Sequence, residues 1–157
     1  MRIFIASDHT GLALKATLAE YLAGEVEDLG AHELSPEDDY PDLVRPCAEK
    51  VAGTPGSMGI VIGGSGQGEA MAANRVPGVR AAVFYGQVRA RGAIDAEGAP
   101  ALDGYDIVRL AREHNDANVL SIGARFVADE EAKEAVRIFL ETPFSGMERH
   151  ARRIGKF

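Results

Sequence analysis

A glycine-rich stretch near the middle of the chain carries a hydroxyl group and a carboxylate close together. Residues 63–68 read Gly-Gly-Ser-Gly-Gln-Gly, with Ser65 inside the run and Glu69 directly after it. Successive backbone N–H groups in such a loop can converge on one point and hold a phosphate, a carboxylate or an enediolate oxygen. If the turn is helical, Ser65 and Glu69 face the same way. The stretch therefore predicts an anion-binding, proton-transfer site.

Two nucleotide-binding motifs and one structural explanation compete with this interpretation. A P-loop is excluded because no Gly-Lys-Ser/Thr follows the glycines. The dinucleotide fingerprint fails at its third glycine, since Gly64 and Gly66 fit the first two positions but Glu69 occupies the third. A tight turn whose glutamate interacts only with a helix dipole stays open on the loop alone.

The glycine run lies between an expected strand and an expected helix. Residues 58–62 are a short apolar run typical of a buried strand, and residues 69–75 are rich in helix-forming alanine. Further strands are expected at 2–7, 26–29, 79–84 and 118–122, and further helices at 11–23, 41–51, 106–114 and 129–141. This alternation predicts an α/β fold, a Rossmann-like three-layer αβα sandwich with a five-stranded parallel sheet.

Ligands of parallel sheets bind at the carboxyl edge, where strands lead into loops. Six chemically useful side chains follow expected strands or lie in strand-to-helix loops: Asp8, His9, Tyr40, Ser65, Glu69 and Arg125. Tyr40 is expected to be extended because it precedes Pro41. His114 ends a helix that precedes a strand, so we expect it at the opposite edge. It could reach the glycine run only from another subunit, and helix capping is its simpler alternative.

The length of 157 residues predicts a single domain, residues 1–157. Residues 86–104 are expected to be a long loop or loosely helical lid, and residues 145–157 a basic C-terminal arm. The net charge of −7 argues against a nucleic-acid partner. The four histidines lack metal-ligand spacing, so no metal is expected.

Cys47 is the single cysteine, which predicts no internal disulfide and suits a reducing cytoplasm. We expect it to be a small buried apolar residue rather than a reactive thiol. No apolar run is long enough to span a membrane, and the first strand begins at once, without a signal peptide. The expected localisation is cytoplasmic, with no membrane partner.

Four motifs, in order along nearly the whole chain, together resemble the ribose-5-phosphate isomerase B family, which includes galactose-6-phosphate isomerase subunits. They are Ser7-Asp-His-Thr-Gly11, Asp39-Tyr-Pro41, the glycine run with Asn74, and Arg112-Glu-His-Asn-Asp-Ala-Asn-Val119. The resemblance implies an aldose–ketose isomerase of sugar phosphates that works through an enediol, with no metal or organic cofactor. It also implies homodimers, or dimers of dimers, with active sites between subunits.

The resemblance further implies a role for each matched residue. Many members have a cysteine base in the glycine run, but Ser65 stands at that place and Cys47 lies elsewhere. The chain is similar to the Ser/Glu subclass, in which Glu69 moves the proton between C2 and C1 and Ser65 assists transfer between O1 and O2. His114 and Asp8 match the ring-opening residues. The remaining matches are substrate contacts at Tyr40, Gly64 and Asn115, enediolate contacts at Gly66, Gln67 and Gly68, and a phosphate-binding set of His9, Arg125, Arg149, His150 and Arg153.

Ribose 5-phosphate and ribulose 5-phosphate are the first expected substrate pair. Residues 86–104 look longer than the usual family connection and are expected near the site, where they could close over the sugar, reshape the pocket or extend the dimer contact. A tetrose-phosphate (erythrulose 4-phosphate) or hexose-phosphate (allose or galactose 6-phosphate) isomerase therefore stays open. A noncatalytic sugar-phosphate-binding module is a further alternative, against which Glu69 and Ser65 speak.

Asp38 and Asp39 are expected to form a solvated loop.

Overall fold

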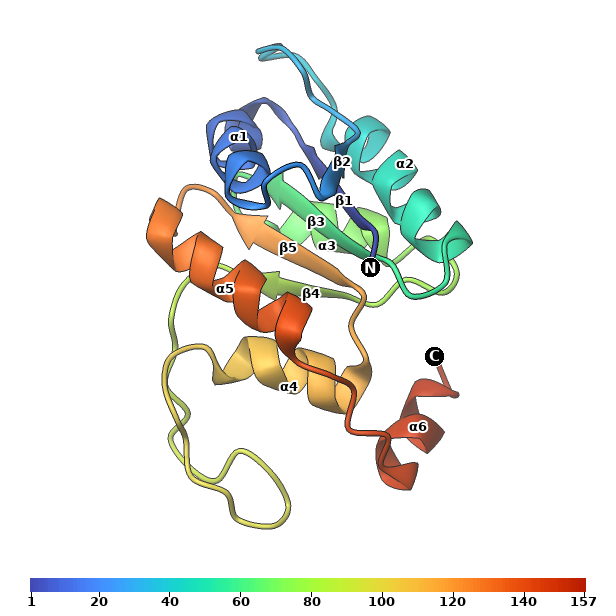
Figure 1. The fold of residues 1–157 in the computed structure, drawn as a ribbon, viewed down its shortest axis with the longest axis vertical. Coiled ribbons are helices and arrows are strands. Elements are labelled where there is room, and N and C mark those ends of the chain that lie inside the picture. Colours follow the sequence, from blue (N-terminus) through green and yellow to red (C-terminus); the bar gives the residue numbers. More distant parts are fainter.

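The computed structural model describes residues 1–157 as a five-stranded sheet between two helical layers (Figure 1). The strands are β1 (Ile3–Ser7), β2 (Val26–Asp28), β3 (Met58–Gly63), β4 (Ala81–Phe84) and β5 (Val119–Gly123). Their order is β2-β1-β3-β5-β4, and every neighbouring pair is parallel. The expected α/β fold with a five-stranded parallel sheet is confirmed.

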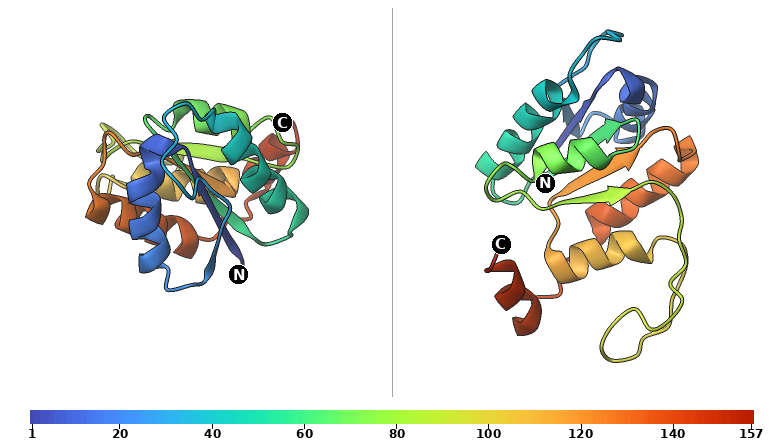
Figure 2. Two further views of the ribbon diagram at one scale, coloured as in Figure 1. Left: turned by 90° about the horizontal axis from the view of Figure 1, so that it is seen from above. Right: turned by 180° about the vertical axis from the view of Figure 1, so that it is seen from behind.

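The direction of each crossover explains which face its helix covers. The steps from β1 to β2 and from β4 to β5 run toward the β2 edge and carry α1 (Leu12–Tyr21) and α4 (Asp106–Asn115). The steps from β2 to β3 and from β3 to β4 run the other way and carry α2 (Tyr40–Gly53) and α3 (Gln67–Ala73). Because such crossovers are right-handed, opposite steps place their helices on opposite faces, as Figure 2 shows. α5 (Asp129–Glu141) packs beside α1 and α4.

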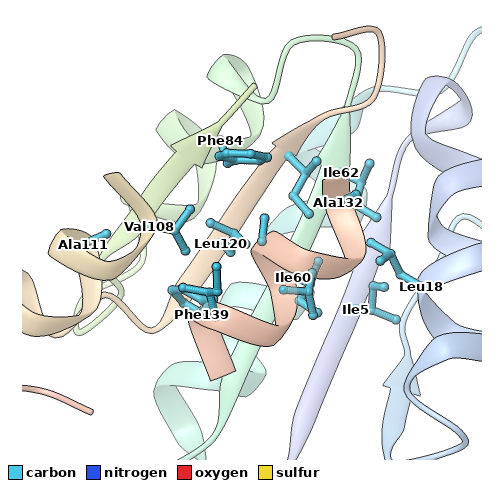
Figure 3. Packing of buried hydrophobic residues seen from close by; sticks show 14 of the residues in the cluster. Ile5, Leu18, Ile60, Ile62, Phe84, Val108, Ala111, Leu120, Ala132 and Phe139 are labelled. Carbon is cyan, nitrogen blue, oxygen red and sulfur yellow. The ribbon is translucent and has the colours of Figure 1, made fainter. Parts of the chain in front are cut away.

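Two apolar clusters, one on each face of the sheet, hold the layers together. Side chains alternate along β1, so that Ile5 faces α1 and α5 whereas Phe4 faces α2. Figure 3 shows the larger cluster, where Leu18 and Phe139 meet the sheet. Each such fully buried side chain contributes about 1.5–3 kcal/mol. Cys47 is buried in the smaller cluster, where burial raises the pKa of its thiol to about 12, so its expected apolar role is confirmed.

The start of α2 differs from the expectation. Tyr40 is the first helical residue, whereas the preceding Asp39 has the extended conformation (φ −96°, ψ 112°). The prediction of an extended Tyr40 before Pro41 is therefore wrong. Pro41 is tolerated because residues of a first helical turn need no backbone N–H partner inside the helix.

Residues 86–104 contain no helix or strand and extend beyond α4 (Figure 1). The backbone N–H of Val88 donates to the carbonyl of Gly104 at 3.1 Å, so the two ends of the segment meet. Near its tip, Glu97 pairs with Arg149 of α6 (Glu148–Ile154), the helix of the C-terminal arm. The segment thus contacts the arm rather than the glycine loop of its own chain. No helix in the structure combines the length and the apolar character needed to cross a membrane.

Candidate active site

The glycine loop, residues 63–68, leads from β3 into α3 and offers unpaired backbone donors. Gly66 has φ +75°, and a methyl group there would lie 3.0 Å from the carbonyl carbon of Ile122, so only glycine fits. The Ser121 hydroxyl donates to the Gly66 carbonyl at 2.6 Å and fixes this approach. The N–H groups of Gly64, Ser65 and Gly68 donate to no other protein atom. The loop can therefore bind an anion through its backbone.

Glu69 lies in the first turn of α3 with only 4% of its surface exposed. Its carboxylate packs against the end of β3, because a methyl group on Gly63 would lie 1.8 Å from Oε1. Burial raises the pKa of Glu69, helped by the nearby Asp8 and opposed by the backbone N–H groups of Glu69 and Gly66. A buried carboxylate with a raised pKa is well suited to accept a proton near neutral pH.

Ser65 does not share the environment of Glu69. α3 begins at Gln67, so Ser65 lies outside the helix, and its side chain is exposed. Its hydroxyl accepts a hydrogen bond from the backbone N–H of Gln67 at 3.3 Å. The condition under which Ser65 and Glu69 would face the same way, a helical turn, is therefore not met, because the left-handed Gly66 interrupts the helix between them.

Two further predicted residues border the glycine loop. The Tyr40 ring lies over Gly68, where a methyl group would meet its Cζ at 2.7 Å. The Arg125 guanidinium lies over Gly64, with Cζ 3.2 Å from such a methyl position, and the Arg125 backbone N–H donates to the Gly64 carbonyl at 3.1 Å. A phenol and a cation thus flank the open N–H groups, which favours a phosphorylated ligand.

Asp8 and His9 follow β1 beside the glycine loop, since the Asp8 N–H donates to the Ile62 carbonyl at 3.2 Å. One Asp8 carboxylate oxygen accepts from Thr10 N and Oγ1, at 2.9 and 2.6 Å, and from Gly11 N at 3.1 Å. The His9 ring contacts Asp38, whose side chain is only 14% exposed. The expectation of a solvated Asp38 is wrong, because the loop before α2 folds back onto His9.

Asp8, His9 and Asp38 place three metal-ligand atoms within 4.8 Å of one another. These groups already partner one another or backbone donors: Asp8 caps the turn that follows β1, and His9 Nδ1 lies 2.5 Å from Asp38 Oδ1. We therefore assign no metal to them.

The other predicted residues gather at the opposite edge of the sheet. His114 and Asn115 end α4, and the His114 ring packs against the His150 ring of the arm, tilted by 40° with 4.2 Å between centroids. His150 is 2% exposed and contacts Ser145 Oγ at 2.9 Å. Burial lowers the pKa of His150, and the neighbouring His114 and arginines lower it further. Arg149 and Arg153 lie on α6 in the same region. The predicted site residues of one chain therefore form two groups on opposite edges of the sheet.

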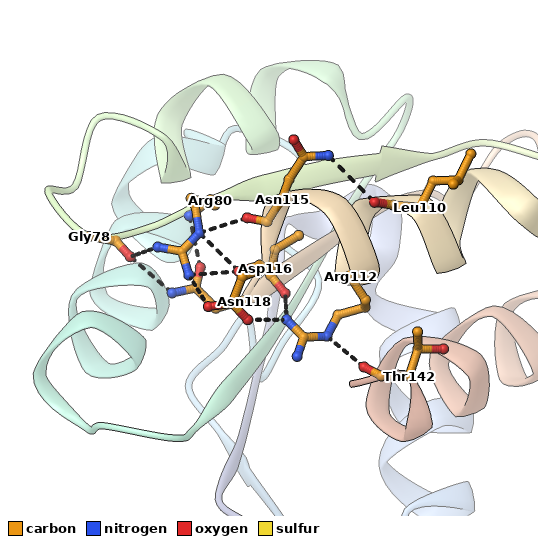
Figure 4. A network of polar contacts seen from close by, with 9 residues as sticks. Gly78, Arg80, Leu110, Arg112, Asn115, Asp116, Asn118 and Thr142 are labelled. Carbon is orange, nitrogen blue, oxygen red and sulfur yellow. Dashed lines mark hydrogen bonds and ion pairs between the residues drawn. The ribbon is translucent and has the colours of Figure 1, made fainter. Parts of the chain in front are cut away.

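An arginine clasp, formed by Arg80 and Arg112 around Asp116, holds the end of α4 (Figure 4). Arg80 Nε donates to the carbonyls of Asn115 and Asp116, both at 2.9 Å. Each guanidinium also donates to one Asp116 carboxylate oxygen, at 2.8 and 2.9 Å. Asp116 has φ +45°, a conformation that aspartate and asparagine tolerate better than most residues. The clasp fixes the position of His114 and Asn115, the last two residues of α4, and no local pattern in the sequence indicates it.

Replacing Asp116 by alanine is expected to lower the free energy of unfolding by about 2–3 kcal/mol, because the buried Arg112 loses its charged partner. Asp116→Asn keeps an acceptor and tolerates the positive φ, so we expect about half that loss. Urea denaturation measures both, with Asp39→Asn as a control at an exposed carboxylate that makes no side-chain cap. Equal stability of Asp116→Ala and the wild type would contradict the clasp.

A parallel sheet whose carboxyl edge combines a buried carboxylate, open backbone donors and a cation defines an α/β protein built for proton transfer on an anionic ligand. The model of the ribose/galactose isomerase family matches residues 3–103 and 99–157. The chain belongs to this family, and the resemblance drawn from its four motifs is confirmed.

The relatives match over nearly full length. A probable ribose-5-phosphate isomerase B from Mycoplasma pneumoniae is 42% identical over 98% of this chain and 91% of the relative. Ribose-5-phosphate isomerase B from Mycobacterium tuberculosis is 39% identical over 98% of this chain and 86% of its own length. The crystal structure of ribose-5-phosphate isomerase B from Mycoplasma genitalium with bound ribulose-5-phosphate superimposes with a TM-score of 0.83 at 41% identity, covering 99% of this chain and 92% of that one.

Proposed function

We propose that this protein is a cofactor-independent aldose–ketose isomerase that interconverts ribose 5-phosphate and ribulose 5-phosphate through an enediolate. The observation that carries the proposal is the Glu69 carboxylate, which is buried against Gly63 with a raised pKa beside unpaired N–H groups. The relative from Mycoplasma genitalium, which was crystallised with ribulose-5-phosphate, supports the choice of sugar.

In the proposed mechanism, Glu69 takes the proton from C2 of the open-chain aldose and returns it to C1. The backbone N–H groups of the glycine loop donate hydrogen bonds to the oxyanion of the enediolate. Electrostatic stabilisation of this kind is usually the largest catalytic contribution. Ser65, being exposed, assists proton transfer between O1 and O2 at the mouth of the site. Tyr40 contacts the sugar, while Arg125 and His9 bind the phosphate.

The residues at the opposite sheet edge are proposed to serve a partner subunit. The outer strand β4 and helix α4 leave an apolar surface, lined by Ala82, Val83, Val88, Ile107 and Leu110. Ile107 is 46% exposed, whereas its neighbour Val108 is buried. An exposed apolar surface beside an unpaired strand edge favours association. A second copy of the chain is its proposed occupant, because α4 also ends in His114 and Asn115, which need another chain's glycine loop.

In such a homodimer, Asp8 beside the glycine loop of one chain and His114 of the partner subunit open the sugar ring. Asn115, Arg149, His150 and Arg153 of the partner subunit complete the sugar and phosphate contacts.

We propose one domain, residues 1–157, with residues 86–104 as an insertion. The two family-model segments meet at residues 99–103, which supports that placement. The free, buried Cys47 thiol is consistent with a reducing cytoplasm.

A substrate panel tests the proposed function. The purified protein is offered ribose 5-phosphate, erythrose 4-phosphate, both erythrulose 4-phosphates, allose 6-phosphate and galactose 6-phosphate, and conversion is followed by NMR in deuterated water. We expect the fastest turnover on ribose 5-phosphate, with deuterium at the exchanged carbon. Faster turnover of a tetrose or hexose phosphate would keep the mechanism and reassign the substrate. No turnover of any sugar would favour the noncatalytic binding module.

A further inference from the structure

Asp38 makes two contacts with one residue of the proposed phosphate site. Its Oδ2 accepts the backbone N–H of His9 at 2.9 Å, and its Oδ1 lies 2.5 Å from His9 Nδ1. A carboxylate that grips both the backbone and the ring of one histidine fixes the position of the ring as well as its orientation. With Nδ1 engaged, Nε2 is the ring nitrogen left to meet a ligand.

The loop that carries Asp38 is held in place at its start, around Ala31, as well as at Asp38. Lys15, which is 2% exposed, donates to both carboxylate oxygens of Asp28 at 2.6 and 2.7 Å, and to the Ala31 carbonyl at 2.6 Å. The Ala31 N–H in turn donates to the Ser7 carbonyl at 2.7 Å, at the end of β1. The segment that leads to Asp38 is thereby tied to the strand that leads to His9.

The groups that face His9 favour its protonated form. The hydrogen bond that His9 donates to the Asp38 carboxylate is the main reason that the pKa of His9 is raised above its usual value, with burial opposing it. The charge of Asp38 and that of Asp8 also raise this pKa, whereas Arg125 lowers it. Asp38 thus offsets the effect of Arg125, the other cation of the proposed phosphate site.

We propose that Asp38 is a positioning residue for substrate binding, which holds His9 so that Nε2–H points at the substrate phosphate. This inference rests on the proposed function, in which His9 contacts the phosphate. A hydrogen bond from a cationic donor to a phosphate dianion is about twice as strong as a neutral one. Asp38 itself stays away from the reacting carbons, so its contribution falls on affinity and not on the chemical step.

The expected pH dependence follows from the sign of the shift. The cation is present below the pKa of His9, and the affinity that depends on it is lost as the pH rises through that value. Without the Asp38 carboxylate the pKa falls, so the loss begins at a lower pH. At still lower pH His9 is cationic with or without Asp38, and the difference disappears. As the pH falls, the substrate phosphate loses its second negative charge near pH 6, and this affects the protein with and without the Asp38 carboxylate equally.

The test compares Asp38→Asn with Glu37→Gln, which removes one charge from the adjacent, exposed residue. At pH 8, Asp38→Asn is expected to raise the KM for ribose 5-phosphate and the inhibition constant of inorganic phosphate by about tenfold, while kcat changes less than about twofold. At pH 6 the ratio to the wild type should approach one. Glu37→Gln should match the wild type at both pH values.

A second measurement needs no variant at Asp38. The NMR signal of the His9 ring, assigned with His9→Gln, should titrate above the ordinary range for histidine in the wild type and shift when inorganic phosphate is added. A KM ratio that does not vary with pH, or a His9 ring that titrates normally, overturns the proposal. If the wild type turns over no sugar phosphate, the proposed function fails instead, so the two failures are distinguishable.

Discussion

Glu69→Gln is expected to lower kcat for ribose 5-phosphate roughly 10³-fold and to leave the affinity for the sugar phosphate nearly unchanged. The amide fills the same space beside Gly63 but cannot accept the C2 proton. NMR in deuterated water should show deuterium incorporation falling together with turnover. Glu49→Gln, on the exposed side of α2, is the matched control and should behave as the wild type. If Glu69→Gln keeps more than about a tenth of the wild-type kcat, the base lies elsewhere.

The same substitution should stabilise the fold at neutral pH. Because burial raises the pKa of Glu69 in the folded state, its contribution to stability is complete below the unfolded pKa and is lost as the pH rises through the folded pKa. At pH 7 the wild type therefore buries an unfavourable charge that glutamine avoids. We expect a higher urea midpoint for Glu69→Gln at pH 7 and equal midpoints near pH 4. Such a trade of stability for activity is typical of catalytic residues.

Mixed dimers of Glu69→Gln and His114→Gln chains are expected to recover activity that neither parent has on ribose 5-phosphate. In the proposed homodimer each site combines Glu69 from one chain with His114 from the other. A mixed dimer then holds one intact site and one doubly altered site. Purified through two different affinity tags, it should show about half of the wild-type turnover per dimer.

The alternative arrangement gives the opposite result. If His114 served the glycine loop of its own chain, both sites of the mixed dimer would be damaged and no activity would return. A tetrose phosphate provides an internal control, because it cannot close the usual ring. His114→Gln alone should therefore leave tetrose turnover nearly intact if His114 acts in ring opening.

Much of the fold could be predicted because its signals are local. Short apolar runs ending in Gly63 and Gly123 specify buried strands, and the acidic start of α5 marks that helix at its observed bounds. The division of the candidate site residues between the two edges of the sheet was predictable for the same reason. In a parallel sheet, chain order alone decides which residues follow a strand and which precede one.

The errors arose where position depends on contacts between distant segments. Asp38 looked solvated because nothing nearby in sequence reveals that its loop returns to His9. In the clasp, Arg80 and Asp116 are 36 positions apart in the sequence. No helical or strand periodicity could indicate a contact over that separation.

The hydrogen bond between Val88 and Gly104 has a consequence for how this enzyme family can vary. Because Val88 and Gly104 lie together, residues 89–103 leave and re-enter the domain at one point. The length of this segment therefore has little effect on the position of the sheet. Doubling a flexible loop costs only about 0.6 kcal/mol in closure entropy. The segment is therefore an exchangeable cassette. It can be shortened, lengthened or replaced while β4, α4 and the glycine loop keep their places, and through Glu97 it also reaches Arg149 of the proposed phosphate site.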